Sequence, residues 1–157
     1  SFLIVMKISN NTPARAIDFS DIREGDKVFQ NIHFQQNDLD RFRVLSGDSA
    51  AMHFDPAFAS NRGFEKNIVH GLLVTSKFSR LLGMHLPGEN SIIQSINFSF
   101  MSPVYLSQEL LYVVSVVRVV QSVNAVLLDL KASNGDTVFV QGKAQCVCVV
   151  DGNNKDE

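Results

Sequence analysis

Apolar and polar residues alternate along most of the second half of the chain. In the segment 95–100, Ile96, Phe98 and Phe100 are separated by polar residues, which is the period of a half-buried β-strand. The segment 110–120 is almost continuously apolar and predicts a central strand. Alternation returns at 126–131, and Asn134-Gly135 predicts a tight hairpin before a last strand at 138–150. We therefore expect about four long antiparallel strands after residue 90.

One long helix is predicted before these strands. Apolar residues recur at helical spacing over 68–82 and cover more than a narrow stripe, so the helix should be buried on much of its surface. Asn67 is the expected N-cap, and Gly83 or Pro87-Gly88 marks the end. Because this helix needs cover on several sides, an antiparallel sheet wrapped around a central helix satisfies the pattern, which is an α+β architecture.

The first third of the chain is less regular. We expect a strand over 27–34, a short helix over 38–45, a turn over 46–49 and irregular backbone over 50–66, where Pro56 and Gly63 interrupt any periodicity. Residues 1–27 are expected to be an N-terminal extension, with the residues before Met6 derived from a vector. The polar residues 151–157 are expected to form a flexible tail.

Composition restricts the classes of function. The 157 residues suit one domain, and 45% hydrophobic with 19% charged residues is an ordinary globular balance. The net charge of −2 gives no electrostatic signature of a nucleic-acid or anionic-membrane partner. Neither a signal peptide nor a stretch able to cross a membrane is expected. Cys146 and Cys148 lie too close in sequence to bridge on a strand, which favours the reducing cytoplasm.

Asp48 and His53 are the main candidate catalytic residues. On a regular helix a separation of five residues points two side chains about 140° apart, so the pair converges only if the backbone between them is irregular. A converging carboxylate and imidazole form an acid–base pair for activating water. The alternative is that Asp48 caps a turn and His53 is a packed side chain. Gly71 has two interpretations as well: close approach of a ligand to a helix N-terminus, or close packing of the sheet.

Several short motifs together resemble the MaoC-like, (R)-specific enoyl-thioester hydratase family, over nearly the whole of 28–150. The motifs are Ser46-Gly47-Asp48 with His53, then Val69-His70-Gly71, Leu86-Pro87-Gly88 and Phe98-Ser-Phe-Met-Ser-Pro103-Val104. The resemblance implies a hot-dog fold that forms homodimers or larger homo-oligomers. It implies hydration of trans-2-enoyl thioesters of coenzyme A or acyl carrier protein, or the reverse dehydration, without a metal or other cofactor.

The resemblance also assigns roles to residues. Asp48 and His53 would bind and activate the water, and the Gly71 N–H would polarise the thioester carbonyl. The residues expected to contact the substrate are Ser46, Val69, His70 and Leu72.

One departure from the family pattern leaves other functions open. The family usually has Asn-Pro where this chain has Ala50-Ala51, so two residues that stiffen the loop are missing. The alternatives are a hot-dog thioesterase, which directs water at the carbonyl carbon, and an acyl-thioester-binding subunit without activity. Acyl length, carrier and physiological direction are left undecided by the sequence.

Overall fold

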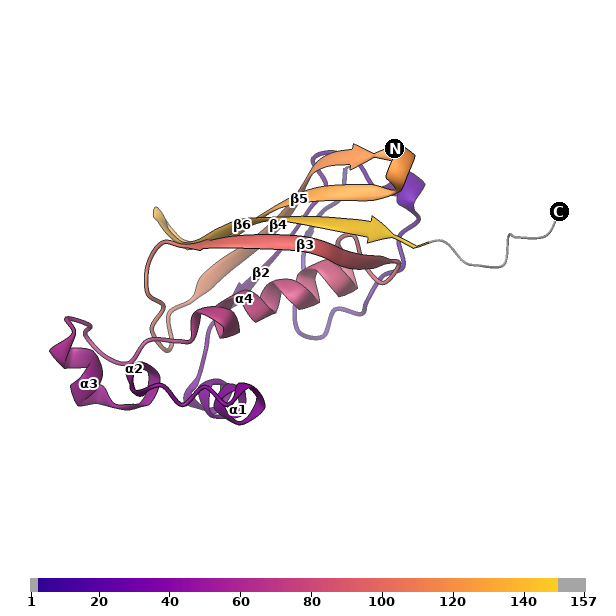
Figure 1. The fold of residues 1–157 in the computed structure, drawn as a ribbon. Coiled ribbons are helices and arrows are strands. Elements are labelled where there is room, and N and C mark those ends of the chain that lie inside the picture. Colours follow the sequence, from indigo (N-terminus) through magenta and orange to yellow (C-terminus); the bar gives the residue numbers. More distant parts are fainter. Residues whose placement is uncertain (1–2, 150–157) are drawn as a thin grey trace.

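A six-stranded sheet curves around one helix, α4 (Gly71–Arg80), in the computed structural model, which describes residues 3–149 (Figure 1). The strands are β1 (Val5–Lys7), β2 (Lys27–Ile32), β3 (Ser91–Phe100), β4 (Leu110–Val120), β5 (Ala125–Asn134) and β6 (Thr137–Cys148). Their order in the sheet is β1-β2-β4-β5-β6-β3. β1 runs parallel to β2 and every other pair is antiparallel. The predicted α+β hot-dog architecture is confirmed.

Alternation along the strands decides which side chains face the helix. On β5, Leu128, Leu130 and Ala132 are buried, whereas Asp129 and Lys131 between them are exposed. The pattern matches the period of two that the sequence showed, because successive side chains of a strand point to opposite faces. The apolar segment 110–120 forms β4, which pairs with β2 on one side and β5 on the other, as predicted for a central strand.

The start of the central helix was predicted wrongly. The helix begins at Gly71 with His70 as N-cap, rather than at residue 68 after Asn67. Ile68 and Val69 are instead extended: Ile68 bridges to Tyr105, and the Val69 N–H donates to the Val104 carbonyl at 2.8 Å. Both residues are β-branched, so extended backbone suits them. Gly83 does not end the helix, which continues through a π-helical turn, η2 (Leu81–His85).

The segment expected to be irregular contains two short helices, α2 (Ala51–Phe54) and α3 (Pro56–Asn61). Asp55 caps α3 by accepting hydrogen bonds from the Ala57 and Phe58 N–H groups, and Pro56 occupies its first position. Helices of four and six residues are too short to show apolar periodicity, which is why the hydrophobic pattern missed them. Before them, α1 (Gln36–Ser46) extends the expected helix, and Gly47 ends it in a left-handed conformation with φ 78°. The single-turn 3₁₀ helices are η1 (Phe19–Asp21) and η3 (Gln121–Val123).

The core lies between α4 and the inner face of the sheet. Phe78 packs against Phe98 and Tyr112, with ring centroids 5.5 and 5.0 Å apart, and the Tyr112 hydroxyl donates to the Val74 carbonyl at 2.8 Å. These contacts fix α4 along the sheet. Helices α1, α2 and α3 gather beyond the N-terminal end of α4, where they form a layer separate from the sheet (Figure 1). The end of the central helix is therefore the place where the two parts of the molecule meet.

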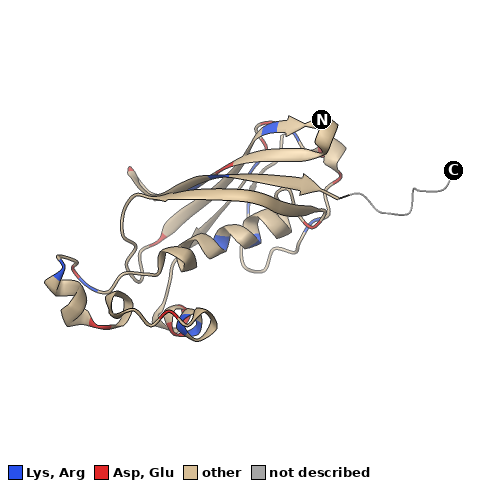
Figure 2. Cartoon of the chain, viewed as in Figure 1, with Lys and Arg blue, Asp and Glu red and all other residues tan. Residues whose placement is uncertain are grey.

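Residues of both charge signs are distributed along the ribbon, on the short helices as well as on the sheet (Figure 2). Among residues 3–149, no helix combines the length and the apolar character needed to cross a membrane. The segment expected as an N-terminal extension contributes β1 and the buried Ile8, while the expected tail at 151–157 lies outside the described residues.

Candidate active site

Asp48 and His53 converge in front of the central helix. Gly47 turns the chain out of α1, and the Ala50 N–H donates to Asp48 Oδ1 at 3.1 Å, so the loop folds back on the carboxylate. His53 then lies on the short helix α2. The side-chain ligand atoms of Asp48, His53 and His70 all lie within 4.8 Å of one another. The irregular backbone between the two residues thus brings together side chains that a regular helix would separate.

The half-buried His53 is held in a defined orientation. Its Nδ1 lies 2.8 Å from the Ile68 carbonyl oxygen. Because a carbonyl only accepts hydrogen bonds, Nδ1 carries the proton of the neutral ring, and Nε2 keeps a free lone pair. The extended backbone at Ile68, which shortened the central helix, therefore also supplies the acceptor that orients this imidazole. Asp48 is exposed to solvent, so the pair is accessible from outside.

His70 is buried behind this pair. Its side chain is 2% exposed, its Nε2 lies 3.2 Å from the Asp48 carbonyl oxygen, and its ring stacks on His53 with centroids 3.8 Å apart. Burial lowers the pKa of His70, and the nearby His53 adds to this, while the hydrogen bond to the Asp48 carbonyl and the Asp48 charge act in the opposite direction. His70 is therefore neutral near pH 7.

Gly71 is the first residue of α4, directly after His70. The first N–H groups of a helix have no acceptor within the helix and are free to bind a developing negative charge. A Cβ at Gly71 would lie 2.9 Å from Cε1 of Phe100, closer than real contacts allow. Only glycine therefore fits without displacing the Phe100 ring.

An apolar pocket of about 350 Å³ adjoins this helix N-terminus. Its lining includes Val69, Gly71, Val74, Phe100, Val104 and Val140. An apolar tail bound there would leave its polar end beside the free N–H groups. Sequence analysis did not select Phe100 or Val140, because their approach to Gly71 depends on how β3 and β6 pass the helix.

The remaining predicted contact residues differ in their surroundings. Val69 lines the apolar pocket, whereas Leu72 is 68% exposed on the outside of α4. Ser46 Oγ donates to the Phe42 carbonyl at 2.6 Å and accepts from the Asp48 N–H at 3.1 Å, so it supports the loop that carries Asp48. Ala50, at one of the positions where Asn-Pro was expected, is the N-cap of α2 and provides no side-chain cap.

The ligand atoms of Asp48, His53 and His70 have a spacing that a metal ion could use, and the carbonyl oxygens occupy only one nitrogen of each imidazole, His53 Nδ1 and His70 Nε2. The accessible groups of this cluster are the exposed Asp48 carboxylate and the free Nε2 of the half-buried His53. A water molecule placed there can donate a hydrogen bond to each of them. The geometry favours acid–base activation of water.

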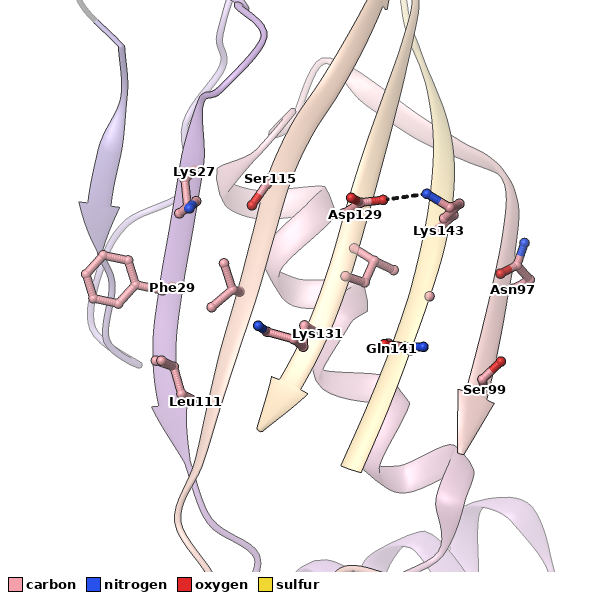
Figure 3. Close-up of a pocket in the computed structure, with 13 residues that line it drawn as sticks. Lys27, Phe29, Asn97, Ser99, Leu111, Ser115, Asp129, Lys131, Gln141 and Lys143 are labelled. Carbon is pink, nitrogen blue, oxygen red and sulfur yellow. Dashed lines mark hydrogen bonds and ion pairs between the residues drawn. The ribbon is translucent and has the colours of Figure 1, made fainter. Parts of the chain in front are cut away.

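A larger hollow of about 800 Å³ lies on the opposite face of the sheet (Figure 3). Lys27, Asp129, Lys131 and Lys143 line it, and Asp129 pairs with Lys143 at 2.9 Å. Figure 3 shows side chains spread over neighbouring strands without converging on one point. Its shape follows from the twist of the sheet, and no imidazole lines it. The smaller pocket is therefore the candidate site, because it lies beside reactive side chains, although the hollow has the larger volume.

Comparison with known proteins identifies the family of the chain. Residues 18–134 match the family model described as the MaoC like domain. The mitochondrial 3-hydroxyacyl-[acyl-carrier-protein] dehydratase of Arabidopsis thaliana is 28% identical, over 92% of this chain and 86% of its own length. The (R)-specific enoyl-CoA hydratase of Aeromonas caviae is 42% identical over 54% of this chain and 63% of its own length.

Solved structures give the same result for the fold. The (R)-hydratase from A. caviae involved in PHA biosynthesis superimposes with a TM-score of 0.78 and 33% identity, covering 82% of this chain and 98% of that protein. The hot-dog sheet, the central helix and the family model, which spans the segment carrying Asp48, His53 and Gly71, lead to one assignment: this chain belongs to the MaoC-like dehydratase family.

Proposed function

We propose that this protein is a hydro-lyase, an (R)-specific enoyl-thioester hydratase that also runs the reverse dehydration of 3-hydroxyacyl thioesters. The observation that carries the proposal is the meeting of the Asp48 carboxylate and the His53 imidazole beside the free N-terminus of α4. Relatives named as hydratases and dehydratases support the same reaction. Asp48, His53 and Gly71 are the residues to which we assign the chemistry.

In the hydration direction, the water donates hydrogen bonds to the Asp48 carboxylate and to His53 Nε2. One O–H bond of the water breaks as its oxygen bonds to the β-carbon, and the released proton passes to this pair. The electron pair of the C=C bond moves through the α-carbon onto the thioester oxygen. The Gly71 N–H stabilises this charge. Return of the proton to the α-carbon completes the addition, and dehydration follows the same steps in reverse.

The substrate that we infer is a thioester of coenzyme A or acyl carrier protein, whose acyl chain enters the apolar pocket of Val69, Val74 and Phe100. The relatives support both carriers, since one is named for enoyl-CoA and another for the acyl carrier protein. We propose that the protein acts in the cytoplasm. The buried free thiols of Cys146 and Cys148 suit a reducing compartment.

We further propose a homodimer or larger homo-oligomer that covers β3. Within the described residues this strand pairs on one side only, with β6. Ile93 and Ile96 face the helix side of the sheet but remain 41% and 39% exposed. Such an edge is covered in stable proteins, and a second copy offers a matching surface. A monomeric mass in light scattering would contradict this proposal.

The test of function is the loss of the conjugated-enoyl absorbance of crotonyl-CoA, with chiral analysis of the 3-hydroxybutyryl product. We expect the wild-type chain to form the (R)-product. Asp48→Asn and His53→Ala should each lower kcat/KM by about a hundredfold or more, because each removes half of the acid–base pair. Asp129→Asn and His33→Ala are the matched controls, since both side chains are exposed away from the site.

Two outcomes would contradict the proposal. Release of free thiol without formation of the hydroxyacyl product would support a thioesterase. Tight binding of enoyl thioesters of both carriers, without turnover of either, would support a binding subunit.

A further inference from the structure

His70 touches each part of the candidate site. Its Nε2–H donates to the Asp48 carbonyl at 3.2 Å, and its ring stacks on His53 with an interplanar angle of 24°. As N-cap, it is also joined directly to Gly71, and its carbonyl accepts the Val74 N–H at 3.0 Å. The Asp48 loop, the His53 ring and the start of α4 come from three separate elements, and this one residue connects them.

We propose that His70 is a positioning residue, which holds the Asp48 carboxylate, the His53 imidazole and the Gly71 N–H in one arrangement for the addition of water. The proposal rests on the proposed function, since it is the hydration reaction that needs this arrangement. His70 itself does not touch the reacting atoms. Its side chain is buried, so it acts through Asp48 and His53.

The His70 ring is enclosed by aromatic side chains. Phe42 and Phe54 approach it edge-on, with ring centroids 4.8 and 5.5 Å away, and the guanidinium of Arg43 covers the Phe54 ring at 4.3 Å. A ring enclosed in this way cannot rotate without displacing its neighbours. A donor with a fixed direction therefore points at the Asp48 carbonyl, on a loop that lacks the usual Asn-Pro.

The protonation state fits the same role. The Asp48 carbonyl accepts the Nε2 proton, so neutral His70 has an unprotonated Nδ1, and that atom is buried without a hydrogen-bond partner in the described structure. A second proton on this ring would bury a charge against the stacked His53, and the nearby Asp48 carboxylate offsets only part of the cost of burial. The neutral ring lets His53 keep Nδ1–H toward the Ile68 carbonyl and Nε2 toward the water.

Two variants separate the two contacts. His70→Phe keeps a ring against His53 but removes the donor to Asp48, whereas His70→Gln keeps an N–H donor but removes the stacked ring. We expect each to lower kcat for crotonyl-CoA by about tenfold or more with little change in KM, because small displacements of reacting groups act on the chemical step. The ¹⁵N shifts of the His53 ring should stay those of a single Nδ1–H tautomer in His70→Phe and become those of a tautomer mixture in His70→Gln.

The hydration assay and the His53 spectrum test different claims. A wild type that hydrates enoyl thioesters of neither coenzyme A nor acyl carrier protein defeats the proposed function, whereas the His53 spectrum still tests the role of His70. Folded variants with normal kcat and an unchanged His53 spectrum, even with a lower melting temperature, would mean that His70 only packs. If neither variant folds, the wild-type spectrum decides, because a His53 ring already averaging between tautomers overturns the proposal.

Discussion

The two ends of the central helical segment each bury a histidine, yet only one end carries a candidate reaction. His70 precedes α4 and His85 closes η2, and the side chains are 2% and 0% exposed. Burial is the main reason why the pKa of each is lowered. The two residues are therefore alike in their burial and in the direction of their pKa shifts.

Their partners differ. His70 donates to a loop that carries an exposed carboxylate, and it stacks on a second imidazole. Neither ring nitrogen of His85 has a partner in the described structure, and its charged neighbours, Arg80 and Arg15, lower its pKa further. A histidine with a lowered pKa therefore does not mark an active site by itself. A better indication is that the histidine converges with other reactive groups at a helix N-terminus.

A pair of glycine substitutions tests the difference between the two ends most strongly. Gly71→Ala should lower kcat/KM by about tenfold or more, because the new Cβ collides with Phe100 and crowds the N–H groups that bind the thioester oxygen. Gly83→Ala is the matched control on η2, where a Cβ meets no atom within 4 Å. It should leave turnover unchanged and stabilise the fold by about 0.5 kcal/mol.

Steady-state kinetics with crotonyl-CoA measure the turnover of both variants, and thermal melting measures their stability. Equal activity of the two alanine variants would remove Gly71 from the site, and with it the functional distinction between the ends.

The pH dependence of stability is a smaller effect, and it should come from both ends. Each histidine has a folded-state pKa below its ordinary value of 6.5, so the unfolded chain binds more protons in the window between the two values. Their contribution to stability is complete above about pH 6.5 and is lost as the pH falls toward the lowered folded-state values. We expect the melting temperature to decrease from about pH 7.5 to about pH 5.5.

His85→Leu should remove part of this decrease, because leucine takes no proton, and it should leave kcat near the wild-type value. A melting temperature that depends on pH equally in wild type and variant would show that His85 is protonated without cost to the fold.

The sequence predicted the regions where one face is buried and failed where single tertiary contacts decide the local structure. Strand β5 followed from alternation because the sheet has one inner face, and β4 followed from its almost continuous apolar run. The helix start was misplaced because Ile68 and Val69 look like helix core, yet they pair with the segment around Tyr105. Such a partner more than thirty residues away leaves no periodic signal.

The candidate site also has residues that the sequence predicted and contacts that it did not. Asp48, His53 and Gly71 were found through residue type and motif, which one chain displays directly. The supporting contacts were not, because the Ile68 carbonyl that orients His53 and the Phe100 ring beside Gly71 depend on tertiary placement. Sequence therefore suggested the candidate reacting groups, and the structure showed which contacts orient them.

The central claim is that Asp48 and His53 act together on one water molecule. Kinetics of crotonyl-CoA hydration by Asp48→Asn, His53→Ala and the double variant test it directly. If the two side chains form one unit, the double variant should lose about as much kcat/KM as the more damaged single variant, because removing either already disables the pair. A double variant whose loss equals the product of the two single losses would contradict the account, since the two residues would then act independently.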